Sequence, residues 1–274
     1  MGPEATRAPD GAARAGNIGV RHVTFAFGGA PAVLEDLSFD VASGEFFVLL
    51  GPSGCGKSTV MNLIAGFEHP TKGSVIAGGR NVDVAGRDRV VIFQDSDSLY
   101  GWLTVRDNVA FPLRVLGVTA RERDERAVAA LKLVGLQGHE GKYPAELSGG
   151  MKQRTQLARA LVLDSPILLM DEPFAALDAQ TRSILQDELV QISVAMRRTV
   201  LFITHDIGEA ILLGDRVGIM RAGPASSIKE TIPIELPRPR RRGSVEFGAL
   251  YERIHQSISE EVQRALRRED SLLK

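Results

Sequence analysis

The sequence has little of what would place the chain in an oxidising compartment, a membrane or a complex with a polyanion. Its one cysteine, Cys55, cannot form an internal disulfide, so a reducing cytoplasm is the simplest compartment. The longest apolar runs, such as Phe46–Leu50, fall far short of the ~18 residues that a membrane helix needs. No apolar signal segment opens the sequence, so export is not expected. The net charge of −1 favours neither nucleic acid nor anionic lipid as a partner.

What remains is an ordinary globular composition, 44% hydrophobic and 24% charged, which suits one large domain or two small ones. Residues 1–16 are rich in Ala, Gly, Pro and Arg without periodicity, which predicts a disordered tail. A single domain is expected over residues 17–222. Residues 223–274 are expected to form a basic linker, with a solvated rather than an anion-binding Arg238–Arg242 cluster, and a C-terminal amphipathic helix.

Strand and helix patterns alternate along the predicted domain, which favours an α/β fold with a mostly parallel sheet. Val20–Phe27 and Leu34–Val41 predict an antiparallel pair joined at Gly28-Gly29. Residues from about 95 to 160 predict a helical insert, with capping boxes at Thr104-x-x-Asp107 and Thr119-x-x-Glu122. The other predicted strands are Phe46–Leu50, Val90–Phe93, Ile167–Met170, Thr199–Ile203 and Arg216–Met220, and the other core helices are Lys57–Ala65, Ala179–Met196 and Ile207–Leu213.

A phosphate-binding loop is predicted at Gly51-x4-Gly56-Lys57-Ser58, between a strand and a helix. Backbone N–H groups and the helix N-terminus would hold phosphate, Lys57 would contact the β- and γ-phosphates, and Ser58 would ligate Mg²⁺. A chance glycine-rich turn is disfavoured by the strand before it and the helix after it. Cys55 is interpreted as a small residue filling a tight loop, rather than as a redox-active thiol.

Polar residues end three of the predicted strands, where ligands bind in such folds. Asp171 suits the shell of Mg²⁺, and Glu172 is the candidate general base that activates water. His205 could bond the γ-phosphate, and the amide oxygen of Gln94 could ligate Mg²⁺. Taken singly, these residues are better interpreted as a solvated acidic pair, a structural histidine and a polar strand cap. The phosphate loop upstream favours the catalytic interpretation.

A second anion-binding helix start is indicated at Leu147-Ser148-Gly149-Gly150, where Ser148 is a good N-cap and the glycines leave N–H groups uncovered. A plain helix cap before a helix over Met151–Leu163 is the alternative. Two such helix ends in one chain suggest that they face each other across a dimer.

With these motifs in this order, residues from about 18 to 222 resemble the ATP-binding subunit of an ABC transporter. The matches are Gly51–Thr59 to the Walker A motif, Gln94 to the Q-loop, Leu147–Gln153 to the signature, Ile167–Glu172 to the Walker B motif, Ala176-Leu177-Asp178 to the D-loop and His205 to the H-loop. Phe27 falls where the family stacks an aromatic ring on adenine. The resemblance implies a P-loop NTPase core with an antiparallel β subdomain and a helical insert.

The resemblance also implies the ligands of the site, which are ATP and Mg²⁺. Catalytic roles fall on Glu172, His205 and Lys57, and Mg²⁺ ligation on Ser58, Gln94 and Asp171. Nucleotide contacts are implied for Phe27, Gly51, Pro52, Ser53, Gly54, Cys55, Gly56, Lys57, Ser58, Thr59, Gln94, Ser148, Gly149, Gly150 and Asp178.

In the family, two subunits form a head-to-tail homodimer with ATP at the interface, where one chain supplies Walker A and the other the signature. The resemblance therefore implies integral-membrane permease subunits, a peripheral location on the cytoplasmic face of the membrane and no nucleic acid. A secreted or periplasmic substrate-binding protein would belong to the same system.

Several segments are similar to the branch that imports nitrate, sulfonate or taurine, among them Trp102-Leu103-Thr104-Val105 and Leu236-Pro237-Arg238-Pro239-Arg240. Gly101 departs from the branch, which often has Pro before the Trp. We therefore expect an importer of a small anion, and a non-transport or exporter-type ABC ATPase is the alternative. The subunit does not touch the substrate, so its residues cannot name it.

Four large apolar residues, Leu99, Tyr100, Trp102 and Leu103, lie just after Gln94. They are either core of the helical insert or part of a groove that receives a short helix of the permease, as the family resemblance implies. We predict that Trp102 is at least partly exposed in the isolated subunit.

Overall fold

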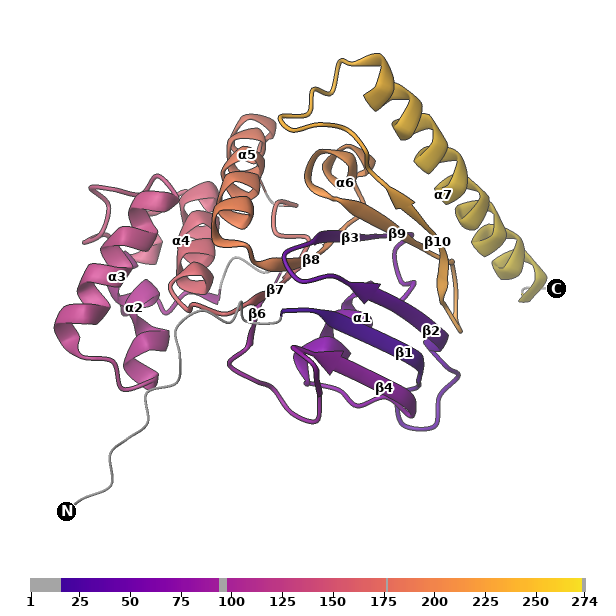
Figure 1. The fold of residues 1–274 in the computed structure, drawn as a ribbon, viewed down its shortest axis with the longest axis horizontal. Helices are drawn as coiled ribbons and strands as arrows, with labels where there is room; N and C mark the ends of the chain where they lie inside the picture. Colours follow the sequence, from indigo (N-terminus) through magenta and orange to yellow (C-terminus); the bar gives the residue numbers. More distant parts are fainter. Residues whose placement is uncertain (1–15, 94–97, 176, 273–274) are drawn as a thin grey trace.

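The computed structural model describes residues 16–93, 98–175 and 177–272. Two sheets and a group of helices make up the fold, with the helices α2, α3 and α4 lying to one side of both sheets (Figure 1). Among the helices in these ranges, none is both long enough and apolar enough to cross a membrane.

The central sheet has the strand order β10-β9-β3-β8-β7-β6. Its strands are β3 (Phe46–Leu50), β6 (Arg89–Ile92), β7 (Ile167–Asp171), β8 (Thr199–Thr204), β9 (Arg216–Met220) and β10 (Ile228–Pro233). All pairs are parallel except β9 with β10. Every residue of β3 and β8 is buried, as expected for strands that are covered on both faces.

Alternate residues of β3 enter two separate hydrophobic cores. Phe46, Val48 and Leu50 pack with the helical unit and with α5 (Ala179–Met196), α6 (Ile207–Leu213) and α7 (Val245–Leu272), whereas Phe47 and Leu49 pack with α1 (Lys57–Ala65) and the second sheet. The period of two that places successive side chains on opposite faces explains this division.

The second sheet is antiparallel, in the order β2-β1-β4-β5, with β1 (Ile18–Phe25), β2 (Leu34–Val41), β4 (Lys72–Ala77) and β5 (Arg80–Asn81). The predicted pairing of β1 with β2 is confirmed, although β1 ends at Phe25 rather than Phe27. The strands β4 and β5 were not predicted.

The helical unit contains α2 (Val105–Val115), α3 (Ala120–Leu133), the 3₁₀ turn η2 (Pro144–Glu146) and α4 (Gly149–Leu161). Both predicted N-caps are confirmed, because the Thr104 and Thr119 hydroxyls accept from the N–H groups of Asp107 and Glu122. Helix α4 begins two residues before the predicted Met151, directly after its cap.

The prediction of a basic linker after residue 222 is wrong in two respects. Residues 228–233 form β10, an edge strand of the central sheet. The Arg238–Arg242 segment is not simply solvated, because Arg238 and Arg240 donate to backbone carbonyls at the end of α6. The alternation of Ile228–Pro233 is weak, with only Ile232 fully buried, so the strand is hard to detect in the sequence.

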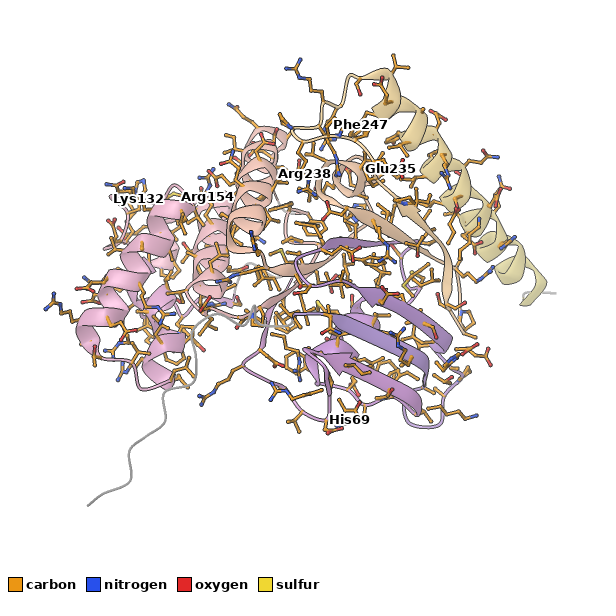
Figure 2. The ribbon with its side chains drawn as sticks, viewed as in Figure 1. His69, Lys132, Arg154, Glu235, Arg238 and Phe247 are labelled. Carbon is orange, nitrogen blue, oxygen red and sulfur yellow. The ribbon has the colours of Figure 1, made fainter. Side chains whose placement is uncertain are left out.

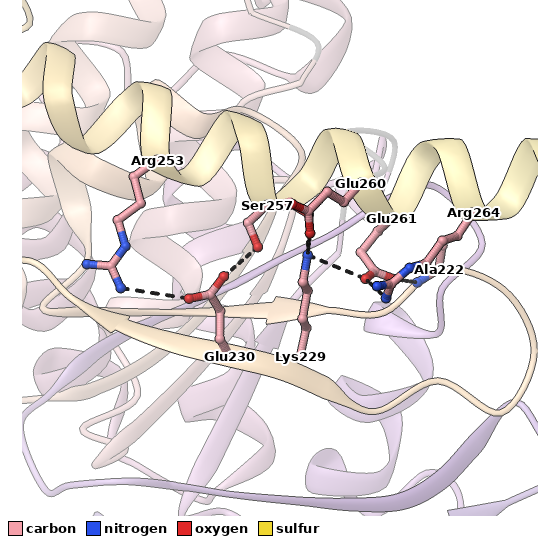
Figure 3. Close-up of polar contacts among 8 residues, drawn as sticks. All are labelled: Ala222, Lys229, Glu230, Arg253, Ser257, Glu260, Glu261 and Arg264. Atoms are coloured by element: carbon pink, nitrogen blue, oxygen red, sulfur yellow. Dashed lines mark hydrogen bonds and ion pairs between the residues drawn. The ribbon is translucent and has the colours of Figure 1, made fainter.

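The predicted C-terminal amphipathic helix is present as α7, and it packs along β10 (Figure 1). Phe247 and Ile254 enter the core, and polar contacts of Arg253, Ser257 and Glu260 join the helix to the strand (Figure 3). Lys229 of β10 donates to Glu260 at 2.7 Å, and the buried Glu261 accepts from the Ala222 N–H at 3.1 Å.

Candidate functional site

The loop between β3 and α1 closes around the ammonium group of Lys57. This side chain is only 7% exposed, and its Nζ donates to the carbonyl oxygens of Gly51 at 2.8 Å and Pro52 at 2.9 Å. Gly56 has a φ of 95°, and a Cβ there would lie 2.9 Å from Leu34 Cδ2. The second glycine of the motif is therefore required by both backbone conformation and space.

The outer side of the same loop is open. Ser53, Gly54 and Ser58 are exposed and Thr59 is half-buried, so a phosphate group can approach the backbone at the start of α1. Cys55 is fully buried, and this burial raises the pKa of its thiol. A buried, protonated thiol is unreactive, which supports its interpretation as a residue that fills the loop.

Asp171 ends β7, and its carboxyl interacts with the Ser58 side chain and with the charge of Lys57. Burial raises the pKa of the Asp171 carboxyl, against the lowering effects of Ser58 and of the Lys57 charge. One hydroxyl and one carboxylate are hard oxygen ligands, and they fit Mg²⁺, which takes its remaining ligands from phosphate and water. No group of three or more His, Cys, Asp or Glu that could hold a metal occurs in the described ranges. Gln94, the third predicted ligand, lies outside the described residues.

Glu172 and His205 directly follow the neighbouring parallel strands β7 and β8, and the structure brings them together as the sequence predicts. His205 Nδ1 lies 3.0 Å from Glu172 Oε2, with side chains 63% and 19% exposed respectively. Glu172 has a φ of 43°, and its N–H donates to the Ile203 carbonyl at 2.9 Å. A left-handed glutamate costs free energy, and such residues gather at functional sites.

The signature segment forms an open helix start. The Ser148 hydroxyl accepts from the Met151 N–H at 3.3 Å, which confirms the N-cap. A Cβ added at Gly149 would meet nothing within 4 Å, whereas one at Gly150 would lie 2.8 Å from Thr181 Cγ2. Within the described residues, no hydrogen bond or ion pair joins this helix start to the phosphate loop of the same chain.

Phe27 and Asp178 lie at the margins of the site. The Phe27 ring is 49% exposed and makes a T-shaped contact with the Phe25 ring at a centroid distance of 4.7 Å, so about half of its surface stays accessible to a ligand. Asp178 accepts from the N–H groups of Gln180 at 3.1 Å and Thr181 at 3.0 Å, and these bonds hold its pKa below the usual range. Asp178 is thus the N-cap of α5. Ala176, in the same motif, lies outside the described residues.

A groove of about 960 Å³ lies between β6 and the helical unit. Its lining includes Phe93, Tyr100, Phe111, Val115 and Arg159. Trp102, beyond this lining, is 75% exposed, which confirms the prediction of exposure, whereas the neighbouring Leu99 is buried in the core. The apolar segment after Gln94 is therefore divided between core and surface.

Sequence reasoning missed a buried polar network behind His205. It contains Thr204, Gln186 and Glu209, of which Glu209 is only 5% exposed. The pattern Asp206-x-x-Glu209 at the start of α6, with a single carboxylate in an otherwise apolar helix, is the signal that could have revealed it.

Comparison with known proteins agrees with this geometry. A sequence profile of the ABC transporter family matches residues 34–175. An uncharacterized ABC transporter ATP-binding protein of Methanocaldococcus jannaschii is 47% identical over 234 residues, covering 85% of this chain and 87% of that protein. The nitrate import ATP-binding protein NrtD of Synechococcus elongatus is 46% identical over 219 residues, covering 79% of this chain and 80% of that protein.

Among solved structures, the dimeric ATP-binding cassette MJ0796 in a post-hydrolysis state with ADP and phosphate superposes with a TM-score of 0.69. It is 28% identical and covers 80% of this chain and all of that chain. The phosphate loop, the carboxylates at the strand ends, the open signature helix and the matched profile lead to one conclusion: the chain belongs to the ABC transporter family.

Proposed function

We propose that this chain is the ATP-hydrolysing subunit of an importer that takes up a small anion such as nitrate, sulfonate or taurine. The observation that carries the proposal is the convergence of Lys57, Asp171, Glu172 and His205 at one edge of the central sheet. The names of similar proteins support a small anion as the transported substrate, because they include nitrate and bicarbonate transport subunits.

In the proposed reaction, Glu172 orients and deprotonates the water that attacks the γ-phosphate of ATP. Lys57 neutralises charge on the phosphates, and the exposed imidazole of His205 bonds the γ-phosphate from the next strand. Ser58, Asp171 and Gln94 would hold Mg²⁺, which would supply positive charge to neutralise the phosphates. The half-exposed ring of Phe27 stacks on the adenine.

We propose a head-to-tail homodimer in which each ATP also meets Ser148 and Gly149 of the second chain. The open space at Gly149 supports this arrangement, because the helix start leaves room for a phosphate group from outside the chain. The dimeric state of the similar cassette MJ0796 supports it as well.

We further propose that the groove beside Tyr100 receives a short helix of a permease, at the cytoplasmic face of the membrane, in a system that also uses a secreted or periplasmic binding protein. The aromatic and aliphatic lining suits the apolar face of a helix. Since Gln94 precedes this segment, nucleotide state and permease position would be linked.

The test replaces Lys57 with Ala in cells and measures uptake of labelled nitrate, sulfonate and taurine. We expect the variant cells to lose uptake of one of these anions. We also expect the purified variant complex to lose phosphate release from ATP. Unchanged uptake of all three in cells whose purified complex has lost ATPase activity would favour the exporter or non-transport alternative.

A further inference from the structure

Three arginines after β10 contact helices α5 and α6, and we name Arg238, Arg240 and Arg242 the arginine strap. They lie in the loop between β10 and α7, where Figure 2 labels Arg238 beside α6. The neighbouring Arg241 is exposed, and its side chain has no hydrogen bond or ion pair to the described residues. The three arginines of the strap therefore make contacts that Arg241, in the same basic segment, does not make.

Arg240 and Arg238 hold the C-terminal end of α6. Nη1 of Arg240 donates to the carbonyl oxygens of Ile211 at 2.7 Å and Gly214 at 2.5 Å, and Nη2 of Arg238 donates to that of Leu213 at 2.5 Å. Burial, and then the charge of Arg238, lower the pKa of Arg240 to about 10, so it stays charged at neutral pH. Carbonyl groups at the end of a helix need such donors, and cations there also suit the helix dipole.

The N-terminal end of α6 is held by the buried carboxylate of Glu209. Glu209 accepts from Gln186 Nε2 at 2.9 Å and from Thr204 Oγ1 at 2.6 Å. The same Thr204 hydroxyl accepts from the Asp206 N–H at 3.0 Å. These bonds fix the backbone on both sides of His205, the residue between Thr204 and Asp206.

Arg242 connects the strap to the network at the N-terminal end of α6. Its Nη2 donates to Gln186 Oε1 at 3.2 Å, and Gln186 in turn donates to Glu209. Gln186 is only 1% exposed, so its amide orientation is fixed by these two partners. A continuous chain of hydrogen bonds therefore runs from the segment that precedes α7 to the backbone of His205.

We propose that the arginine strap is a positioning device that sets the reach of His205 toward the γ-phosphate. The inference rests on the proposed role of His205. Helix α6 has seven residues, about 10 Å at 1.5 Å per residue, so it moves as one rigid piece when either end shifts. Releasing the strap lets α6 and His205 move away from the position that meets the terminal phosphate.

The test measures binding of ADP and of a non-hydrolysable ATP analogue to the full chain carrying Arg242→Ala or Arg240→Lys, with Arg241→Ala as the matched control. We expect the analogue to bind about twofold to thirtyfold more weakly to the strap variants, the range typical of residues that modulate a site without touching the ligand. Affinity for ADP, which lacks the γ-phosphate, stays unchanged. The control variant binds both nucleotides as the unaltered chain does.

The His205→Ala variant tests whether the strap acts through His205. It is expected to weaken analogue binding alone, and adding Arg242→Ala to it produces no further loss, because both changes act through one contact. Equal weakening for ADP and the analogue, or additive losses in the double variant, would show that the strap only stabilises the fold. If His205→Ala leaves analogue binding intact, the role of His205 and the inference fail together, while Lys57→Ala still tests ATP hydrolysis.

Discussion

Glu172 combines a left-handed backbone with a side chain that is mostly buried against His205. A hydrogen bond from the Glu172 N–H to the Ile203 carbonyl of β8 helps to hold this unfavourable backbone conformation. Lys57 is similarly constrained, because two loop carbonyls hold its ammonium group in place. At the scale of residues, the groups proposed to be catalytic are thus held in place by the protein itself, which would reduce reorganisation in the transition state.

Lys57→Ala should lower both ATP affinity and turnover, since the charge contacts bound and reacting phosphates. Loss of one preorganised contact of this kind costs about 3–4 kcal/mol of transition-state stabilisation, a fall in rate of about 150-fold to 900-fold. Phosphate release and nucleotide titration measure it, with Lys132→Ala on the exposed face of α3 as control. Unchanged affinity and rate in Lys57→Ala would remove the basis for the site assignment.

Glu209→Gln should change how stability depends on pH. Burial raises the pKa of this carboxyl above 4.5, against the lowering hydrogen bond from Thr204. A raised pKa means that its contribution to stability is present at low pH and is lost as pH rises through the folded-state value. Gln does not titrate, so the free energy of unfolding of the variant should improve relative to the unaltered chain as pH rises above 4.5. Denaturant titrations across pH, with the exposed Glu252→Gln as control, measure the difference. A difference that is constant with pH would contradict the burial argument.

At the scale of elements, strong local patterns were predicted well and weak ones were not. The five buried residues of β3 and the caps Thr104 and Thr119 carry their signals in a few adjacent residues. β10 lacks such a signal, because it is an edge strand whose residues are mostly half-buried under α7.

The polar network behind His205 illustrates a second limit. Arg242, Gln186 and Glu209 are separated by up to 56 positions along the chain, and they meet because α6 packs beside α5 and the loop before α7 lies against both. Composition identified the arginines as a charge cluster, for which a solvated linker is the usual interpretation. The direct site residues were predictable because parallel strands bring their carboxyl ends to one edge.

Trp102→Ala should spare basal ATPase activity and reduce transport, because the side chain is 75% exposed beyond the groove and outside the core. As the only tryptophan, it also reports directly on the surface. Iodide should quench its fluorescence in the free subunit, and the permease should protect it. Val128→Ala, an exposed apolar residue on α3 away from the groove lining, is the control. An unquenchable tryptophan, or transport unaffected by its loss, would exclude this surface from the permease contact.

At the scale of the whole molecule, the phosphate loop and the signature helix belong to separately packed parts of the chain. Helix α1 packs against β4, β6, β7 and β8, whereas α4 packs against α2, α3 and β6. In the proposed homodimer, the two half-sites on one chain are completed by a second copy in a head-to-tail arrangement.

Glu172→Gln should accumulate as a dimer in the presence of ATP and Mg²⁺, because the variant keeps the shape of the site and loses the base that ends the bound state. Light scattering with ATP, compared with ADP, measures the mass. Lys57→Ala combined with Glu172→Gln is the control, since weak nucleotide binding should prevent the association. A Glu172→Gln variant that stays monomeric at every protein concentration would count against the nucleotide-linked dimer.

The composite site is tested most directly by mixing two inactive variants, Lys57→Ala and Ser148→Arg, and measuring phosphate release. Their mixed dimer keeps one intact site, formed by the phosphate loop of the Ser148→Arg chain and the signature of the Lys57→Ala chain. With random pairing in a symmetric dimer, the mixture should recover about a quarter of the unaltered rate. Lys57→Ala mixed with Glu172→Gln has no intact site in any pairing and should stay inactive. Activity of the first mixture no higher than that of its components, or equal recovery in both mixtures, would contradict a site shared between two chains.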